Sequence, residues 1–373
     1  MALTTTTPPV LSDRALNRAT LDRQLLLRFA PGSAEWAVRH LVGLQAQNTK
    51  PPYYALAARL DGFRPEDLSR LMEDRKVARI VTLRSTVHTH TADDAVALRR
   101  LVQDGAVDRE LRMFLKRLDG VDLDRLGALS ADYVEEQPRT LKELRAHLLR
   151  EWPDADPQAL GAAARCLLPL VQVTPRGLWG RSGQVALTTA RQWFPGTVDD
   201  DPADLDETVL RYLGAFGPAS VRDMQAWCGL TRLRPAFERL RPGLLVFRDE
   251  RGTELFDLPD APRPDADTPA PARLLPEFDN LLLSHADRTR VVPAAYRSRT
   301  WTGNQAHRVF LLDGFLAGIW HLDEGRDRTV LTVEAFGRTT RTQRAELTAE
   351  AERTLRLLGP RDVPYEIVHA TRP

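Results

Sequence analysis

Apolar and polar residues follow helix-like and strand-like periods along this chain, and one order of predicted elements occurs three times. In the first stretch, apolar residues at helical spacing predict helices over 16–29, 33–42, 52–60 and 65–75. Segments rich in β-branched residues then predict strands over 78–83 and 86–90, separated by Arg84-Ser85. Several helices followed by a small β-hairpin are the layout of a winged helix, a helix-turn-helix variant with a β-hairpin wing.

Two later stretches repeat this order. Helices are predicted over 122–135, 141–151 and 157–168, with strands over 171–174 and 184–189. Helices over 205–214, 219–228 and 231–241 then precede strands over 244–249 and 253–258. We therefore predict three tandem winged helices, over 15–120, 121–198 and 199–258, after a disordered tail over 1–14.

The last hundred residues predict a different kind of unit. Residues 259–272 hold five prolines and three aspartates, which is typical of a linker. A hairpin over 307–322 turns at Asp313-Gly314, and it precedes a strand over 329–336, a helix over 341–358 and a strand over 365–370. The predicted fold class is thus α+β, mainly α, with a C-terminal α+β unit over 273–373.

Composition limits the environment of the chain. Its 373 residues are 43% apolar and 28% charged, which is ordinary for a protein that buries a core. No run approaches the roughly 18 apolar residues of a membrane span, and the first ten residues lack the pattern of a signal peptide. The only cysteines are Cys166 and Cys228, too few for a disulfide framework or a four-thiolate zinc site. We expect a cytoplasmic protein that uses no metal and does not enter a membrane.

The charge is nearly balanced, with 52 basic and 51 acidic side chains, which would argue against nucleic acid as a partner. Its distribution changes that conclusion. Six acids and no base lie between 199 and 207, and without them 52 basic side chains face 45 acidic ones. Windows over 36–60, 75–92 and 165–191 contain basic residues and no acid. Overall neutrality therefore does not exclude DNA binding.

A pair of glutamines, Gln45 and Gln47, precedes Pro51-Pro52. Proline favours extended geometry in the residue before it, and residues two apart in an extended segment share a face. Both amides are therefore expected to project together from a helix end. By themselves, such glutamines more often cap neighbouring backbone groups than carry chemistry.

Other polar residues permit several interpretations. His88 and His90 share a face of a predicted strand, but no third ligand has a suitable spacing for zinc, so packing or DNA contact is the better expectation. Glu277 and Asp279 could act as general bases, or could pair with Arg288 or Arg290. Neither a G-x-S-x-G elbow nor a Walker-type or G-x-G-x-x-G loop occurs in the sequence, so a serine nucleophile and a nucleotide cofactor are not expected.

Several segments together resemble the AlkZ/YcaQ family of winged-helix DNA glycosylases. They are LNRATLDRQLLL (16–27), LVGLQAQNTKPPYYALAARL (41–60), TLRSTVHTH (82–90), LLPEFDNLLLSHADRTRVV (274–292) and LLDGFLAGIWHL (311–322). The resemblance extends from about residue 15 to residue 369. Its most specific element is Gln45-Ala46-Gln47, which is similar to the Gln-x-Gln branch associated with self-resistance to azinomycin.

The resemblance implies three winged helices in a C-shape around a basic channel, lined by Gln45 and Gln47 as catalytic residues. It implies a monofunctional glycosylase that releases bulky or crosslinked N7- or N3-alkylpurines from double-stranded DNA, without a cofactor and as a monomer. Charge and position make further residues candidates for DNA contact: Lys50, Arg84, His88, His90, Arg176, Arg181, Arg288 and Arg290.

Two other functions stay open from the sequence. A non-enzymatic winged-helix regulator would bind a specific DNA sequence and release no base. A hydrolase that uses Glu277 or Asp279 would need a nucleophile or cofactor motif that the sequence does not contain.

Overall fold

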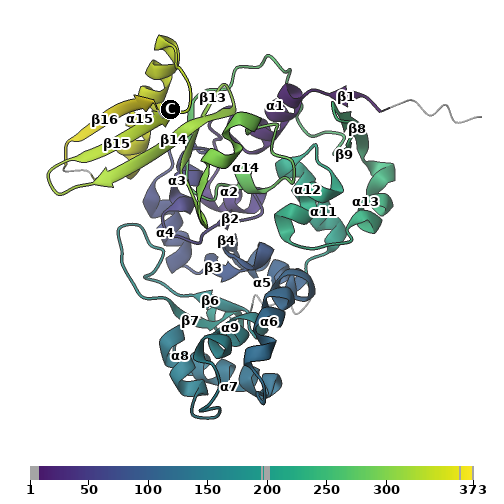
Figure 1. Cartoon of the computed structure of the whole chain (residues 1–373), viewed down its shortest axis with the longest axis vertical. Coiled ribbons are helices and arrows are strands. Elements are labelled where there is room, and N and C mark those ends of the chain that lie inside the picture. Colours follow the sequence, from purple (N-terminus) through teal and green to yellow (C-terminus); the bar gives the residue numbers. More distant parts are fainter. Residues whose placement is uncertain (1–7, 195, 197–201, 361–362, 372–373) are drawn as a thin grey trace, which may run out of the picture.

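The computed structural model describes residues 8–194, 196, 202–360 and 363–371, and it repeats one order of elements three times (Figure 1). The first two repeats each have a helix, a short strand, two helices and a hairpin whose second strand pairs with the short strand, and the third has a single bridge in place of that strand. The first repeat consists of α2 (Ala34–His40), β2 (Leu44–Gln45), α3 (Pro51–Ala57), α4 (Pro65–Glu73), β3 (Val77–Val81) and β4 (Val87–Thr91).

The other two repeats follow the same plan. The second consists of α7 (Leu123–Glu136), β5 (Arg139–Thr140), α8 (Leu141–Leu148), α9 (Pro157–Leu167), β6 (Leu170–Gln172) and β7 (Ala186–Thr189). The third consists of α11 (Leu205–Phe216), α12 (Val221–Cys228), α13 (Arg234–Leu240), β8 (Leu245–Asp249) and β9 (Glu254–Asp257). In the third repeat a single bridge between Ala219 and Phe256 replaces the short strand.

The hairpins of the first two repeats join in one sheet. Its strand order is β2-β4-β3-β6-β7-β5, and the junction pairs Arg79 with Gln172 and Ile80 with Val171 in antiparallel register. Between these repeats the chain forms α5 (Ala92–Leu101), a π-helical turn (Gln103–Val107) and α6 (Asp108–Phe114). Because backbone hydrogen bonds cross from one repeat to the next, the two repeats form one body rather than separate modules.

The first described residues of the chain pack against the third repeat. Strand β1 (Val10–Leu11) pairs in parallel with β8, and α1 (Asp13–Arg23) follows it. The expectation of a disordered tail is therefore wrong for residues 8–14, while residues 1–7 lie outside the described part. The buried Arg23 also joins the start of the chain to the third repeat, donating to both carboxylate oxygens of Asp257 at 2.5 and 2.9 Å.

The C-terminal unit contains a five-stranded sheet in the order β10-β13-β14-β15-β16, covered by α15 (Arg341–Leu358). Its strands are β10 (Arg273–Leu275), β13 (Val309–Leu312), β14 (Phe315–Glu324), β15 (Thr329–Ala335) and β16 (Tyr365–Thr371). Between β10 and β13 lie α14 (Asn280–Leu283) and the small hairpin of β11 (Trp301–Thr302) and β12 (Gln305–Ala306). Its core is continuous with that of the first repeat, since Trp320 and Phe310 belong to the same buried cluster as Leu56 and Tyr54. The unit is thus packed against the first repeat and not suspended from a spacer.

The segment over 259–272 has no helix or strand, as predicted, but it is held in place. Arg18 donates to the backbone oxygen of Thr268 at 2.6 Å, and Arg23 donates to that of Pro262 at 3.1 Å. Of the acidic stretch, residues 199–201 lie outside the described part, Asp204 caps α11, and Asp206 pairs with Arg239 at 2.5 Å. No described helix has the length and apolar character needed to cross a membrane.

Candidate active site

The two glutamines lie where β2 ends: Gln45 belongs to the strand, and Gln47 lies in the irregular stretch that leads to α3. The expectation of extended geometry before the prolines is wrong at Lys50, whose backbone is helical (φ −79°, ψ −33°). Gln45 pairs with His88 on β4, and the backbone nitrogen of Ala46 donates to the oxygen of Val87 at 2.7 Å. Ala46 is fully buried, so it packs this segment against the sheet. Gln45 is only 7% exposed, whereas Gln47 is open to solvent. The two amides therefore occupy different surroundings: one is held in the protein and the other is free to meet a ligand.

Arg84 holds Gln45 in place. Its Nη2 donates to Gln45 Oε1 at 2.6 Å, and its Nη1 donates to the backbone oxygen of Trp227 in α12. The residue lies in the turn between β3 and β4 with a left-handed backbone (φ 53°). Burial lowers the pKa of Arg84 to about 10, so the guanidinium stays cationic at neutral pH. A charged donor thus orients the oxygen of Gln45 and connects it to the third repeat.

Two buried histidines support this strand. His88 Nδ1 donates to the oxygen of Thr86 at 3.0 Å, and its Nε2 faces Arg84 at 3.4 Å. His90 Nε2 lies 2.8 Å from the hydroxyl of Thr82, and the two rings stack with centroids 5.5 Å apart. Burial lowers both pKa values, that of His90 to about 4, so both rings are neutral near pH 7.

The expectation that His88 and His90 contact DNA is wrong in this structure. Their side chains are 2% and 0% exposed, so neither ring reaches the surface. Gly43 shows how closely the space around His90 is filled: a Cβ atom there would lie 2.2 Å from the His90 ring. These histidines therefore act as packing groups beneath the glutamine segment.

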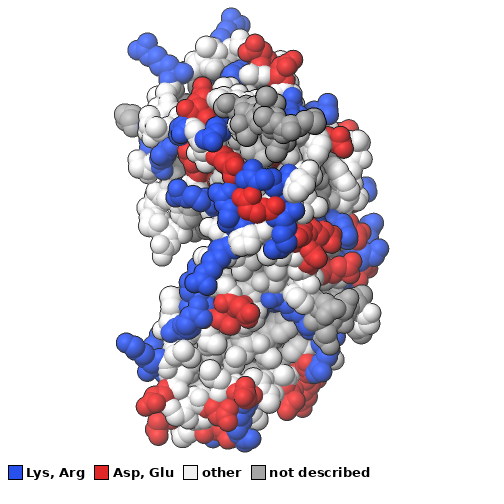
Figure 2. Space-filling view, turned by 90° about the vertical axis from the view of Figure 1, so that its right-hand side faces the viewer, with Lys and Arg blue, Asp and Glu red and all other residues white. Residues whose placement is uncertain are grey.

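The remaining basic candidates for DNA contact differ in how exposed their side chains are. Arg181 and Arg288 are exposed, and Lys50 is half-buried with its Nζ 2.5 Å from Glu324 Oε2. Arg176 is half-buried beside Gln47, and its Nη1 donates to the oxygen of Gly183 at 3.1 Å. These four residues stay predictions as DNA contacts. Figure 2 shows lysine and arginine side chains in a band across the middle of one side of the molecule, beside a hollow.

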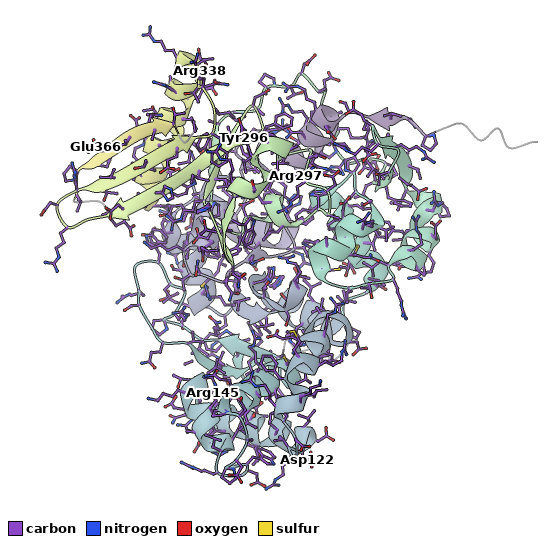
Figure 3. All side chains as sticks on the ribbon, viewed as in Figure 1. Asp122, Arg145, Tyr296, Arg297, Arg338 and Glu366 are labelled. Atoms are coloured by element: carbon purple, nitrogen blue, oxygen red, sulfur yellow. The ribbon has the colours of Figure 1, made fainter. Side chains whose placement is uncertain are left out.

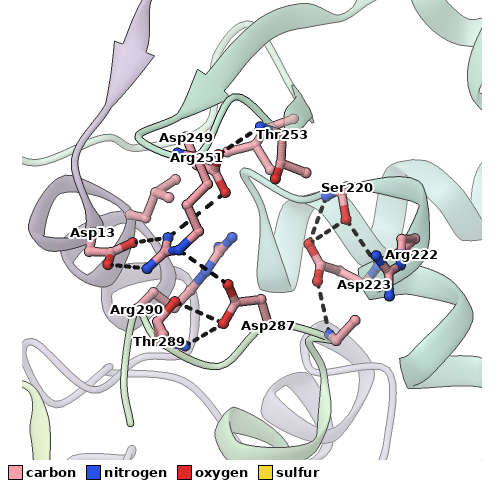
Figure 4. A pocket seen from close by; sticks show the side chains of 13 residues that line it. Asp13, Ser220, Arg222, Asp223, Asp249, Arg251, Thr253, Asp287, Thr289 and Arg290 are labelled. Carbon is pink, nitrogen blue, oxygen red and sulfur yellow. Dashed lines mark hydrogen bonds and ion pairs between the residues drawn. The ribbon is translucent and has the colours of Figure 1, made fainter. Parts of the chain in front are cut away.

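Arg290 does not fit the expectation of DNA contact. It is 5% exposed and donates to the backbone oxygen of Pro218 at 2.7 Å and to the hydroxyl of Thr20 at 3.2 Å. It lines a cavity of about 170 Å³ in which Arg251 lies between Asp13 and Asp287 (Figure 4). The lining of this cavity includes neither glutamine, and its charges join α1, α12 and the hairpin of the third repeat.

The two acids singled out in the sequence are buried and paired, but with other arginines than Arg288 or Arg290. Asp279 accepts from Arg59 at 2.8 and 2.9 Å. Glu277 accepts from Arg308 Nε at 2.9 Å and from Asn48 Nδ2 at 3.1 Å. Glu277 thus contacts the residue that follows Gln47. No local pattern could have revealed this contact, because the two residues are 229 positions apart.

Among the described residues, no group of three or more His, Cys, Asp or Glu side chains could hold a metal ion. What the site offers is a neutral amide fixed by a cation, a second amide open to solvent, and an adjoining recess of about 390 Å³ on whose lining Gln47 lies. Such groups can orient a water molecule or a sugar, and they supply no strong base.

Comparison with known proteins gives consistent matches over most of the chain. The sequence model of the AlkZ-like DNA glycosylases matches residues 38–357. An interstrand DNA cross-link repair glycosylase of Streptomyces sahachiroi is 25% identical over 374 residues, covering 93% of this chain and 97% of that protein. The solved structure of the Streptomyces sahachiroi DNA glycosylase AlkZ superposes with a TM-score of 0.79 at 23% identity, covering 96% of this chain and all of the other.

Proposed function

The chain belongs to the family of AlkZ-like DNA glycosylases, and we propose from this membership that it unhooks DNA interstrand crosslinks by hydrolysing the N-glycosidic bonds of bulky N7- or N3-alkylpurines. The observation that carries the proposal is the arrangement of Gln45 and Gln47, one fixed by Arg84 and the other exposed on the adjoining recess. The family assignment also favours an enzyme over a regulator that only binds DNA.

The three repeats are winged helices in this proposal, and double-stranded DNA binds along the hollow and the basic side chains that Figure 2 shows. Their common order of helix, strand, two helices and hairpin supports this assignment. Phosphate groups would meet exposed or half-buried basic side chains, of which Lys50, Arg176, Arg181 and Arg288 are our candidates. The enzyme acts as a monomer on chromosomal DNA in the cytoplasm, and its task is self-resistance to a DNA-alkylating natural product.

The chemistry suits neutral amides. A purine alkylated at N7 or N3 is cationic, so its glycosidic bond is weak and the base departs neutral. The enzyme has to orient water and stabilise an oxocarbenium-like sugar rather than supply a strong base. Gln45 Oε1 has two lone pairs, of which Arg84 uses one, so the other can accept from a water molecule. Gln47 provides the second amide, and together they place that water at the anomeric carbon.

Glu277 has a supporting role here. It is only 6% exposed, and it accepts hydrogen bonds from Asn48 and Arg308, so it holds the residue that follows Gln47 in place and is shielded from solvent. This geometry argues against Glu277 as the general base of an ordinary hydrolase.

The test is release of bases from duplexes that carry 7-methylguanine or an interstrand crosslink, read as abasic sites. Gln45→Ala and Gln47→Ala should each slow excision by about 100- to 1000-fold, the effect of removing one preorganised polar group, while duplex binding persists. Gln192→Ala, at an exposed glutamine on α10 (Ala190–Trp193), is the matched control. Full activity in the Gln45/Gln47 double variant would show that the glutamines are not catalytic.

A further inference from the structure

The recess that adjoins Gln47 has a wall of unusual composition. It lies where the hairpin of the first repeat meets α8 and α9 of the second, and its volume is about 390 Å³, within the range of small-molecule sites. Apolar side chains of both repeats form much of its surface, among them Val81, Val87, Leu141 and Leu187. Three arginines and no carboxylate are found among the described residues that line it. The recess is thus apolar and cationic at once.

Arg145 is the feature that points to a ligand. It lies on α8 in the lower part of Figure 3, and its side chain crosses Gly161 of α9 so closely that a Cβ there would lie 2.6 Å from Arg145 Nε. Within the described residues, Arg145 Nε has no hydrogen-bond partner although it is buried. The Nε of Arg176, on the same recess, also lacks one among these residues. Of the three arginines, Arg165 differs because it pairs with Glu110.

The charges decide which part of a substrate can enter. An alkylated purine is itself cationic, so arginines repel it, and the recess does not suit the damaged base. A guanidinium stacks favourably on a neutral aromatic ring, and apolar walls gain from covering such a ring. The occupant that fits is therefore a neutral, flat aromatic group carried by the alkyl chain.

We propose that this recess is a binding site for the aromatic part of a bulky purine adduct, held between the apolar walls and the guanidinium of Arg145. The inference rests on the proposed glycosylase function, because it places the adduct beside Gln47. The enzyme would then recognise the alkyl group of the adduct as well as the weakened glycosidic bond. A substrate with an aromatic group would bind more tightly than a methylated purine.

The experiment compares two duplexes that differ only in the N7 substituent of one guanine, methyl or benzyl. The protein should bind the benzyl duplex about tenfold more tightly and excise the benzyl adduct correspondingly faster at low enzyme concentration. Ala162→Trp fills the recess from α9 and should abolish this preference while leaving 7-methylguanine excision unchanged. Arg145→Met, which keeps the apolar stem and removes the charge, should reduce it severalfold.

Ala146→Trp, at an exposed position of α8, is the matched control and should keep the full preference. Thermal unfolding of each variant establishes that it is folded. Equal binding of both duplexes by the original protein, or a preference that survives Ala162→Trp, would overturn the proposal. An equal loss on both duplexes in Arg145→Met would also overturn it, since Arg145 would then be contacting the DNA backbone. If the original protein excises neither adduct, the proposed function fails, while the binding comparison still decides whether the recess takes an aromatic group.

Discussion

Arg84 should control the rate of excision rather than the affinity for DNA. Its guanidinium is committed to two protein oxygens, Gln45 Oε1 at 2.6 Å and the backbone oxygen of Trp227. An arginine used in this way has little freedom to neutralise a phosphate. Replacing it by methionine removes both hydrogen bonds and keeps the apolar stem, so the side chain of Gln45 loses its fixed orientation.

The size of the effect follows from the kind of hydrogen bond. A bond from a charged donor contributes about 1.5–3 kcal/mol. If the transition state needs the orientation that this bond maintains, its loss slows single-turnover excision by about 10- to 150-fold. Arg84→Lys should recover only part of the rate, because one ammonium group cannot bridge Gln45 and Trp227 with the planar fork of arginine. Affinity for an undamaged duplex should change less than about twofold, well under the energy that one phosphate contact supplies.

The assay measures single-turnover excision at saturating enzyme together with duplex binding across a range of salt concentrations. A variant that neutralises one phosphate fewer has a slope of log affinity against log salt that is shallower by about 0.9. Arg181→Ala, at an exposed candidate for DNA contact, should show that change and keep the maximal rate. The reasoning is refuted if Arg84→Met makes the salt slope shallower as Arg181→Ala does and leaves the rate at saturation unchanged.

Three further predictions concern stability, each measured by urea unfolding. Arg59→Met should lower the unfolding free energy by about 3–5 kcal/mol, because it removes the arginine that pairs with the buried Asp279. The same change at Arg239, in an exposed ion pair, should cost less than about 1 kcal/mol, and similar losses at both sites would contradict this. Burial holds the pKa of His90 near 4, below its unfolded value of about 6.5, so the folded protein loses stability as pH falls through that interval. Between pH 7 and pH 5 the unfolding free energy of the original protein should fall by roughly 2 kcal/mol more than that of His90→Gln. Equal losses in the two proteins would show that the pKa of His90 is not lowered by burial. Gly43→Ala should destabilise by more than the about 1–2 kcal/mol of left-handed strain alone, since its φ is 92° and the new methyl meets the His90 ring; a loss within that range would show that the ring moves away freely.

Elements with strong local signals are predicted well from the sequence. The helix over 341–358 matches α15 because Thr340 caps its start and Gly359 follows its end. The turn at Asp313-Gly314 is present between β13 and β14. The first predicted helix is too long: α1 ends at Arg23, and Leu25 adopts a left-handed backbone (φ 58°) that no helical pattern reveals.

The site is harder to predict, because burial and pairing depend on distant parts of the chain. The Pro51-Pro52 pair predicts an extended segment before it, but only Leu44 and Gln45 lie in a strand, and Lys50, directly before Pro51, has a helical backbone (φ −79°, ψ −33°) because it begins α3. That His90 is buried, or that Glu277 contacts Asn48, follows from tertiary packing alone. The pairing of β3 with β6 likewise joins residues more than ninety positions apart, where periodicity carries no information.

The sheet shared by the first two repeats has a mechanical consequence. In a protein built from separate modules, the modules could move relative to one another when DNA binds. Here, moving the second repeat away from the first would break the backbone hydrogen bonds between β3 and β6. On binding, the protein therefore keeps its shape and the DNA changes its own. Bending DNA by 40–90° costs on the order of 1–6 kcal/mol and less at steps that already stack poorly. A lesion that makes the duplex easier to bend would therefore be bound in preference to undamaged DNA, because less bending energy is needed to fit it to the rigid protein.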